Sequence, residues 1–328
     1  MKLKLQHYLL SVLVVCTALL QGNAFAQNAT AYPKGPVKII VNFPAGGTVD
    51  TLARLVGQRL SEQWGKPVTI ENRPGAGGNI GTQAAYLAEP DGLTLLASPP
   101  GPLTINQNLY KDMTFDPSKF VPIITIAQVP NVITARIDFP ANTEKELIAY
   151  VKANPGKVTF ASQGNGSTSH LTAQLLSNLA GLKMVHVPYK GEGPALIDLM
   201  AGRVDLFVGN ISAVVKFRDE KKVKFIAVAS QKRSLVAPDV PTAAEAGLPG
   251  FNASAWFALV APPGTPTSIT EDINKQVNEI LKVPYVRARI QALGGDVGGG
   301  SSKELGAFMA QERIRWKQVI DSSHVTMD

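Results

Sequence analysis

The sequence predicts an α/β protein with mainly parallel sheets, organised as two domains. Short β-branched segments alternate with segments whose apolar residues recur at helical spacing, which is the pattern of successive βα units. The chain has 328 residues, and about 300 residues exceed what one ordinary hydrophobic core organises. Two extended segments, residues 121–136 and 251–262, are predicted to cross between the domains.

The N-terminal 26 residues have the order of features found in secretory signal peptides. Lys2 and Lys4 precede an uncharged run from Tyr8 to Leu20, and Ala24-Phe25-Ala26 follows as a small-x-small cleavage site. A membrane anchor is the alternative, but the run is too short to cross about 30 Å of hydrocarbon. We therefore expect residues 1–26 to be a signal peptide that is cleaved after Ala26.

Loss of this segment would leave a chain without cysteine, because Cys16 is the only one. A lipoprotein is an alternative that Cys16 raises, but Val15 stands where a lipobox has a small residue. Without cysteine the mature chain has no disulfide and no thiolate chemistry. The formal charge would fall from +7 to +5, since the segment carries two lysines and no acid. The remaining basic residues are scattered, which argues against nucleic acid as a partner.

The first βα series begins with a strand at residues 37–41. A glycine-containing loop leads from it into a helix, and further strands are expected at residues 68–70 and 93–96. The apolar residues that recur at helical spacing in this helix are Val49, Leu52, Ala53, Val56 and Leu60.

A second series begins near Thr143, which forms a capping-box pattern with Glu146 and opens a helix that extends to residue 152. A further helix carries Leu171, Leu175 and Leu179. Strands are expected at residues 158–161, 184–187, 204–208 and 225–228. The same capping pattern recurs at Thr242 with Glu245, Ser268 with Glu271 and Ser301 with Glu304, so the C-terminal third is predicted to be mostly helical.

The two extended segments define the predicted domain boundaries. If both connect the domains, the first lobe is discontinuous and comprises residues 27–130 and 251–328, and the second comprises residues 131–250. Two connections suit a hinge, because only a few residues must absorb the rotation.

Two loops rich in glycine and hydroxyl residues are candidate anion sites. The first runs from Phe43 to Asp50 and the second from Ser162 to His170, each between a predicted strand and helix. The first N–H groups of a helix lack helical partners and lie at the positive end of its dipole, so they favour an anion. The alternative is an ordinary turn, with Thr48 and Ser167 or Ser169 as the helix N-caps.

Some of these residues fit a structural role equally well. Asp50 in the first helical turn is better suited to capping than to contact with an anion. His170 is expected to cap or pack, and His186, in an apolar strand, to lie in the core. In the loop from Tyr189 to Pro194, Lys190 is a candidate cation for a second carboxylate, with a solvated lysine as the alternative.

Enzyme signatures are not found. Residues 75–81 have the spacing G-x-G-x-x-x-G, which differs from the dinucleotide fingerprint, and no acid follows at the required distance. No G-x-S-x-G elbow accompanies Ser167 and Ser169, and three mature histidines without cysteine do not predict a metal centre. We therefore expect no catalytic residue, metal or cofactor.

Taken together, a set of motifs in a fixed order resembles the substrate-binding receptors of tripartite tricarboxylate transporters, the TctC or Bug family. The similar segments are residues 40–47, 71–81, 90–92 with 95–96, 152–157, 162–170, 186–191, 238–242, 245–250 and 261–266. They extend over nearly all of the mature chain. One departure is Val49, where family members usually carry threonine, so a side-chain hydroxyl is missing from the first loop.

The resemblance implies a type II periplasmic-binding-protein fold, with two lobes joined by crossover strands around a ligand cleft. It implies a periplasmic monomer that binds a di- or tricarboxylate, an amino acid or an aromatic acid, and two membrane subunits as partners in uptake driven by an ion gradient. A sensor receptor that feeds a signalling system is the alternative, and a secreted hydrolase is a weaker one. The candidate ligand-binding residues are Phe43, Ala45, Gly46, Gly47, Thr48, Asp50, Ser98, Ser162, Gly166, Ser167, Thr168, His170, Tyr189, Lys190 and Asn210.

Overall fold

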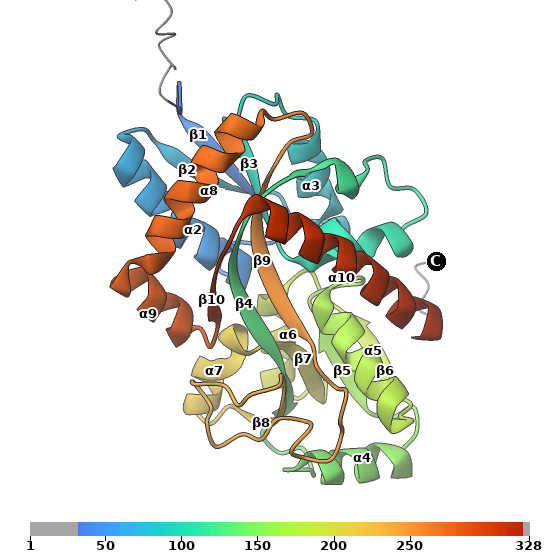
Figure 1. The fold of residues 1–328 in the computed structure, drawn as a ribbon. Helices are drawn as coiled ribbons and strands as arrows, with labels where there is room; N and C mark the ends of the chain where they lie inside the picture. Colours follow the sequence, from blue (N-terminus) through green and yellow to red (C-terminus); the bar gives the residue numbers. More distant parts are fainter. Residues whose placement is uncertain (1–31, 324–328) are drawn as a thin grey trace, which may run out of the picture. The chain divides into compact units, whose positions relative to one another are not determined.

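Ten strands form one curled sheet in the part of the chain that the computed structural model describes, residues 32–323 (Figure 1). The signal peptide predicted at residues 1–26 lies outside these residues. The chain divides after Lys34, and every strand of this sheet belongs to the unit that begins at Gly35. The strands are β1 (Val37–Val41), β2 (Val68–Asn72), β3 (Thr94–Ser98), β4 (Val121–Arg136), β5 (Thr159–Ser162), β6 (Val185–Pro188), β7 (Leu206–Asn210), β8 (Val223–Ala229), β9 (Ser254–Ala261) and β10 (Asp296–Gly299).

The sheet is mixed, and the prediction of mainly parallel pairing was wrong for its centre. The order is β2-β1-β3-β9-β4-β7-β5-β6, and β8 and β10 also pair with β4. Pairing is parallel at the two outer parts, β2-β1-β3 and β7-β5-β6. Strand β4 pairs antiparallel with β7, β8, β9 and β10. The cause is the long connecting strand, which returns against its neighbours instead of following a βα crossover.

The long strand β4 divides the sheet into two halves. Its residues 121–130 pair with β9 and its residues 131–136 pair with β7 and β8. We call β1, β2, β3, β9 and β10 the first half of the sheet and β5, β6, β7 and β8 the second half. The predicted crossover at residues 121–136 coincides with β4. The chain passes between the two halves of the sheet a second time just before β9. There the carbonyl oxygen of Ala253 accepts from the N–H of Asn131, and the N–H of Ala253 donates to the carbonyl oxygen of Ala229.

Helices cover both halves (Figure 1). They are α2 (Thr48–Trp64), α3 (Asn79–Tyr86), α4 (Glu144–Ala153), α5 (Thr168–Ala180), α6 (Glu192–Met200), α7 (Ile211–Asp219), α8 (Thr267–Lys282), α9 (Pro284–Ala292) and α10 (Ser302–Ser323). Short helical segments are η1 (Ala76–Gly78), η2 (Gly101–Ile105), η3 (Asn106–Asn108) and η4 (Pro117–Lys119). The apolar face predicted for α2 is buried throughout. In α5 the pattern holds only in part, because Leu171 is buried and Leu179 is 44 % exposed.

Helices begin at three of the four predicted starts, two of them with the predicted cap. Ser301 and Glu304 form a reciprocal capping box before α10, and the Thr143 hydroxyl caps α4. Thr242 and Glu245 form the same reciprocal bonds but open only a turn, since Gly247 at φ +107° and Pro249 stop a helix. At Ser268 the predicted helix is present without the predicted cap, because α8 begins at residue 267 after a proline. The C-terminal third is therefore mostly helical only from residue 267 onward.

The C-terminal helix α10 connects two hydrophobic clusters. Its residues Leu305 and Met309 pack in a cluster with β3 and β9, whereas Trp316 and Ile320 pack in a cluster with α5 and β7. The indole N–H groups of Trp256 and Trp316 both donate to one carboxylate oxygen of Glu312, at 3.0 and 2.8 Å. This buried bond ties α10 to β9, because a buried indole needs an acceptor.

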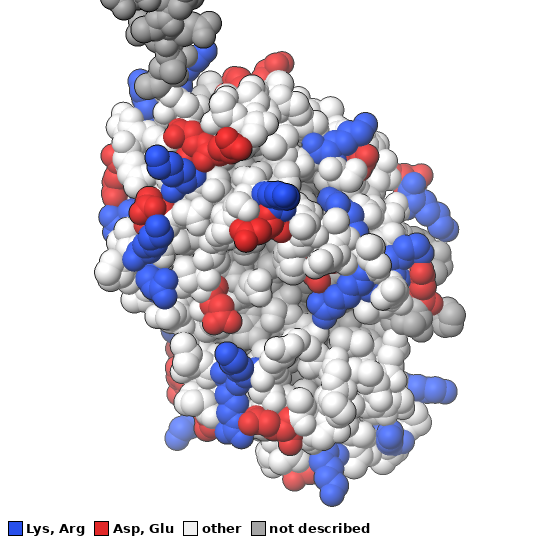
Figure 2. Space-filling model, in the orientation of Figure 1, with Lys and Arg blue, Asp and Glu red and all other residues white. Residues whose placement is uncertain are grey.

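Charges of both signs are interspersed on the face of the molecule in Figure 2. Among residues 32–323, no helix combines the length and apolarity that a bilayer span requires.

Candidate functional site

The loops that follow strands of both halves meet in a cleft with two adjoining pockets. The first, which we call the Thr48 pocket, has about 380 Å³, and the second, the Tyr189 pocket, has about 670 Å³. The walls shared by both are Phe43, Pro44, Gln163 and Gly191. Most of the walls come from segments that follow β1, β2, β3, β5, β6 and β7. The carboxyl ends of strands are where open α/β sheets bind ligands.

Thr48 is the centre of contact between the two halves. It is the first residue of α2, preceded by Gly47, so Thr48 is not the N-cap that the alternative reading expected. Its hydroxyl oxygen lies 2.7 Å from that of Ser212 on α7 and 3.3 Å from the amide nitrogen of Asn210 at the end of β7. Its N–H and hydroxyl donate to the carboxylate of Glu192 at 3.2 and 3.0 Å.

Glu192, the first residue of α6, places its carboxylate against four donors. Besides Thr48, it accepts from the side-chain amides of Gln163 at 2.8 Å and Asn210 at 2.7 Å. Burial raises the pKa of Glu192, and the hydrogen bonds from Asn210 and Thr48 oppose that rise. These partners are all neutral, so no cationic side chain among the described residues balances the Glu192 carboxylate.

Asp50 stabilises the first glycine loop from behind. Its carboxylate accepts from the N–H of Gly46 at 2.9 Å, from the Arg54 guanidinium at 2.9 Å and from the Asn72 amide at 2.9 Å. Burial raises the pKa of Asp50, but these bonds outweigh it and hold the pKa below its usual value. Asp50 therefore fixes the backbone of the loop and does not line either pocket.

The second glycine loop is held by a stack of rings. Ser167 is the N-cap of α5 and accepts from the N–H of His170 at 3.2 Å. The His170 and His186 rings stack with centroids 3.9 Å apart, and Phe160 stacks on His186 at 4.8 Å. Burial lowers the pKa of His170 to about 4 and that of His186 to about 3, to which the neighbouring His170 also contributes. Both rings are thus neutral and pack.

The same stack orients Ser162, whose hydroxyl lies 2.6 Å from Nε2 of His186. His186 is partly buried on β6 and not in the core, which corrects the expectation for that residue. The prediction that His170 caps or packs is confirmed in its packing role.

Some of the predicted ligand-binding residues line one of the two pockets, and the others lie behind the lining residues. Those that line the Thr48 pocket are Phe43, Ala45, Gly46, Gly47, Thr48 and Asn210. Tyr189 and Lys190 line the Tyr189 pocket. Those behind the walls are Asp50, Ser98, Ser162, Gly166, Ser167, Thr168 and His170. The role of each in ligand binding stays a prediction.

Sequence reasoning missed Glu192, Ser212 and Gln163. Glu192 lies within the loop from Tyr189 to Pro194 that the sequence singled out, but an acid in the first turn of a helix usually serves the helix dipole. Its separation of 144 positions from Thr48 in the sequence leaves no local signal of their contact.

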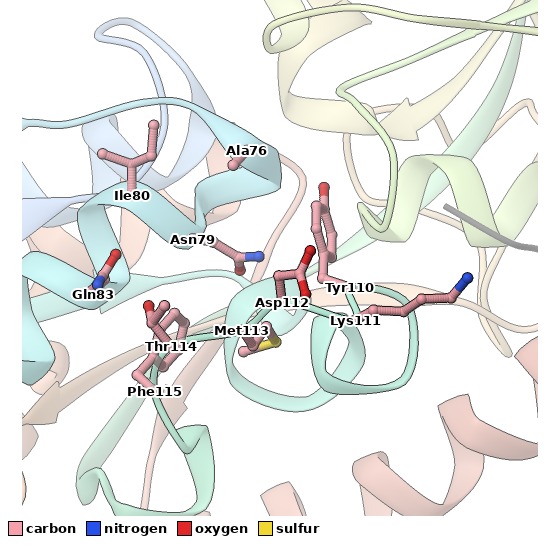
Figure 3. A pocket seen from close by; sticks show the side chains of 10 residues that line it. All are labelled: Ala76, Asn79, Ile80, Gln83, Tyr110, Lys111, Asp112, Met113, Thr114 and Phe115. Carbon is pink, nitrogen blue, oxygen red and sulfur yellow. The ribbon is translucent and has the colours of Figure 1, made fainter. Parts of the chain in front are cut away.

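A separate pocket of about 470 Å³ lies beside the Tyr189 pocket (Figure 3). Residues of η1 and α3 form one side and residues 110–115 the other. Ala76, Ile80 and Tyr110 line both pockets. Nowhere in residues 32–323 do three His, Cys, Asp or Glu side chains gather as a metal site requires.

The mixed sheet, the long connecting strand and the cleft at the strand ends define a solute-binding protein of the α/β class. Residues 52–325 match the model of the tripartite tricarboxylate transporter family receptor, and the chain belongs to this family.

Three solved structures are similar over nearly their whole length. Rpa4515 of R. palustris with adipate has a TM-score of 0.87 at 34 % identity, covering 90 % of this chain and 99 % of that one. MatC from Rhodopseudomonas palustris with bound malate has a TM-score of 0.84 at 35 % identity, covering 88 % and 100 %. The periplasmic binding protein BugD has a TM-score of 0.85 at 35 % identity, covering 90 % and 100 %. These likenesses confirm the predicted family and the periplasmic-binding-protein fold.

Proposed function

We propose that this receptor binds a small carboxylate in the periplasm and delivers it, chemically unchanged, to the two membrane subunits of a tripartite tricarboxylate transporter. Uptake is then driven by an ion gradient. The observation that carries the proposal is the cleft itself, which loops from both halves line at the carboxyl ends of strands, beside the starts of α2, α6 and α7. The adipate and malate of two similar structures support a carboxylate as the ligand.

Export and hinge motion belong to the same proposal. Cleavage after Ala26 would release the mature chain. Residues 27–130 with 251–328 form one lobe and residues 131–250 the other, and closure brings the cleft walls together on the ligand. The hinge lies where β4 and the segment before β9 pass between the halves of the sheet. A receptor of this kind acts as a monomer and needs no cofactor.

The experiment is a binding titration with the mature chain after removal of bound ligand by partial unfolding and refolding. Calorimetry with adipate, malate, aspartate, leucine and benzoate is expected to find at least one ligand in the micromolar range, about −8 kcal/mol. Small-angle scattering should show compaction on binding, and mass spectrometry should recover the ligand unaltered.

A matched pair of variants tests the position of the site. Thr48→Val removes a hydroxyl that lies in the pocket wall, whereas Thr51→Val removes one that bonds the Gly47 carbonyl a turn further along α2. We expect Thr48→Val to weaken carboxylate binding at least about tenfold and Thr51→Val to leave it within about twofold. Equal effects, or turnover of the ligand, would contradict the proposal.

A further inference from the structure

One corner of the Thr48 pocket is rich in hydrogen-bond acceptors. Asn210 is only 2 % exposed and lines this pocket. Its Nδ2 donates to Glu192, which fixes the orientation of the amide, because the opposite orientation would set two acceptors against each other. The Oδ1 of Asn210 is then an acceptor without a hydrogen-bond partner among residues 32–323. An unpaired buried acceptor is unfavourable, so this corner suits a donor.

The charges of the pocket wall also favour a donor group on the ligand, and one that is positively charged. Glu192 is the acidic residue of the pocket wall, and its four hydrogen-bond donors are neutral. Apolar side chains such as Phe43, Leu196 and Phe257 form much of the remaining wall. The basic residue of this wall, Lys216, has an 80 % exposed side chain and pairs with Glu220. A second negative charge beside the Glu192 carboxylate would be repelled, and a positive charge would be attracted and would favour its ionised form.

We propose that Glu192 and Asn210 bind the ammonium group of the ligand, so that the receptor selects a carboxylate bearing an amine over the same carboxylate without one. The inference rests on the proposed function and narrows its ligand to the amino-acid class. An ammonium group has three N–H donors and no acceptor, which fits one carboxylate oxygen of Glu192 together with Oδ1 of Asn210. The apolar wall favours a side chain that is itself apolar.

The test compares three pairs of compounds that differ only in the amine. The pairs are L-leucine with 4-methylpentanoate, L-phenylalanine with 3-phenylpropionate, and L-2-aminoadipate with adipate. Calorimetry on the mature wild-type chain is expected to find at least about a tenfold preference for the amino member of the pair that binds. Glu192→Gln should abolish that preference by weakening binding of the amino member of the pair.

Two further variants make the test specific. Glu220→Gln removes an exposed carboxylate outside the pocket wall and should leave the preference unchanged. Asn210→Leu removes the unpaired acceptor and should also reduce the preference, which keeps the test available if Glu192→Gln does not fold. Wild-type protein that binds both members of each pair equally, or a preference that survives in folded Glu192→Gln, would overturn the inference and leave the proposed function standing. Folded wild-type protein that binds no carboxylate, with or without the amine, would contradict the proposed function itself.

Discussion

Glu144 gives a sharp prediction, because a buried carboxyl group makes stability depend on pH. This residue is the first of α4 and is 1 % exposed, and neither carboxyl oxygen has a hydrogen-bond partner among residues 32–323. Burial raises its pKa from 4.5 to about 7. Because the folded pKa is the higher one, the contribution of this group to stability is fully present below pH 4.5 and is lost as the pH rises through about 7.

The magnitude follows from that shift. Relative to a Glu144 that stays protonated, ionisation of this group lowers the free energy of unfolding by ~3 kcal/mol at about pH 8. At about pH 5 the same effect is less than ~1 kcal/mol. Glu144→Gln keeps the shape and removes the charge, but also removes a favourable helix-dipole interaction of about 0.5 kcal/mol. We expect it to stabilise the protein by about 2 kcal/mol at pH 8, a rise in Tm of roughly 5 °C, with little effect at pH 5.

Thermal and urea unfolding followed by circular dichroism at both pH values measure this effect. Glu146→Gln, on the same helix, is the matched control. The Glu146 carboxylate accepts from the N–H of Asn142 at 2.7 Å. Glutamine keeps an acceptor oxygen and loses only the charge near the helix N-terminus, so this variant should destabilise the protein by about 0.5 kcal/mol. The reasoning is refuted if Glu144→Gln destabilises the protein at pH 8, or stabilises it equally at both pH values.

Three further predictions concern the cleft and its supports. Acid should destabilise the protein through His170, because burial lowers the pKa of this residue from 6.5 to about 4. The stability that the neutral His170 ring contributes is complete above pH 6.5 and is about 2 kcal/mol smaller at pH 5. Urea unfolding in the Glu144→Gln background measures this change, and an unchanged stability at pH 5 would argue against a buried neutral stack. Thr48→Val and Glu192→Gln should couple by about 1 kcal/mol in a double-mutant cycle of unfolding, whereas Thr51→Val with Glu192→Gln should be additive; additivity in both cycles would mean that the Thr48–Glu192 bond contributes nothing. Glu312→Leu should destabilise the chain by about 2 kcal/mol or more, since it removes the buried oxygen that accepts from two indoles. A wild-type melt would contradict the role given to this bond.

The sequence predicted the positions of the strands along the chain better than it predicted which strands pair with each other. Residues 37–41 and 121–136 are strands with the predicted bounds, because β-branched runs bounded by turn residues carry that information locally. Nothing local states that β4 pairs antiparallel with its neighbours, so the mixed centre of the sheet was not foreseen. The capping box at Thr242 formed its bonds and still gave no helix, since Gly247 and Pro249 prevent propagation.

The candidate site was predicted to a similar extent. The first glycine loop does line the cleft, because its position between a strand and a helix N-terminus follows from the sequence. The contribution of Glu192 could not be predicted, as an acid in the first turn of a helix has a sufficient local explanation in the dipole. Its contact with Thr48 depends on two loops from different halves of the sheet, which only the tertiary structure brings together.

The most direct test of the central claim is a crystal structure of the mature protein with the carboxylate that binds it most tightly. The ligand is expected in the Thr48 pocket, between the start of α2 and the starts of α6 and α7, within hydrogen-bond distance of Thr48, Glu192 or Asn210. A ligand found instead in the pocket of Figure 3, or on the outer surface, with the Thr48 pocket unchanged, would contradict the account.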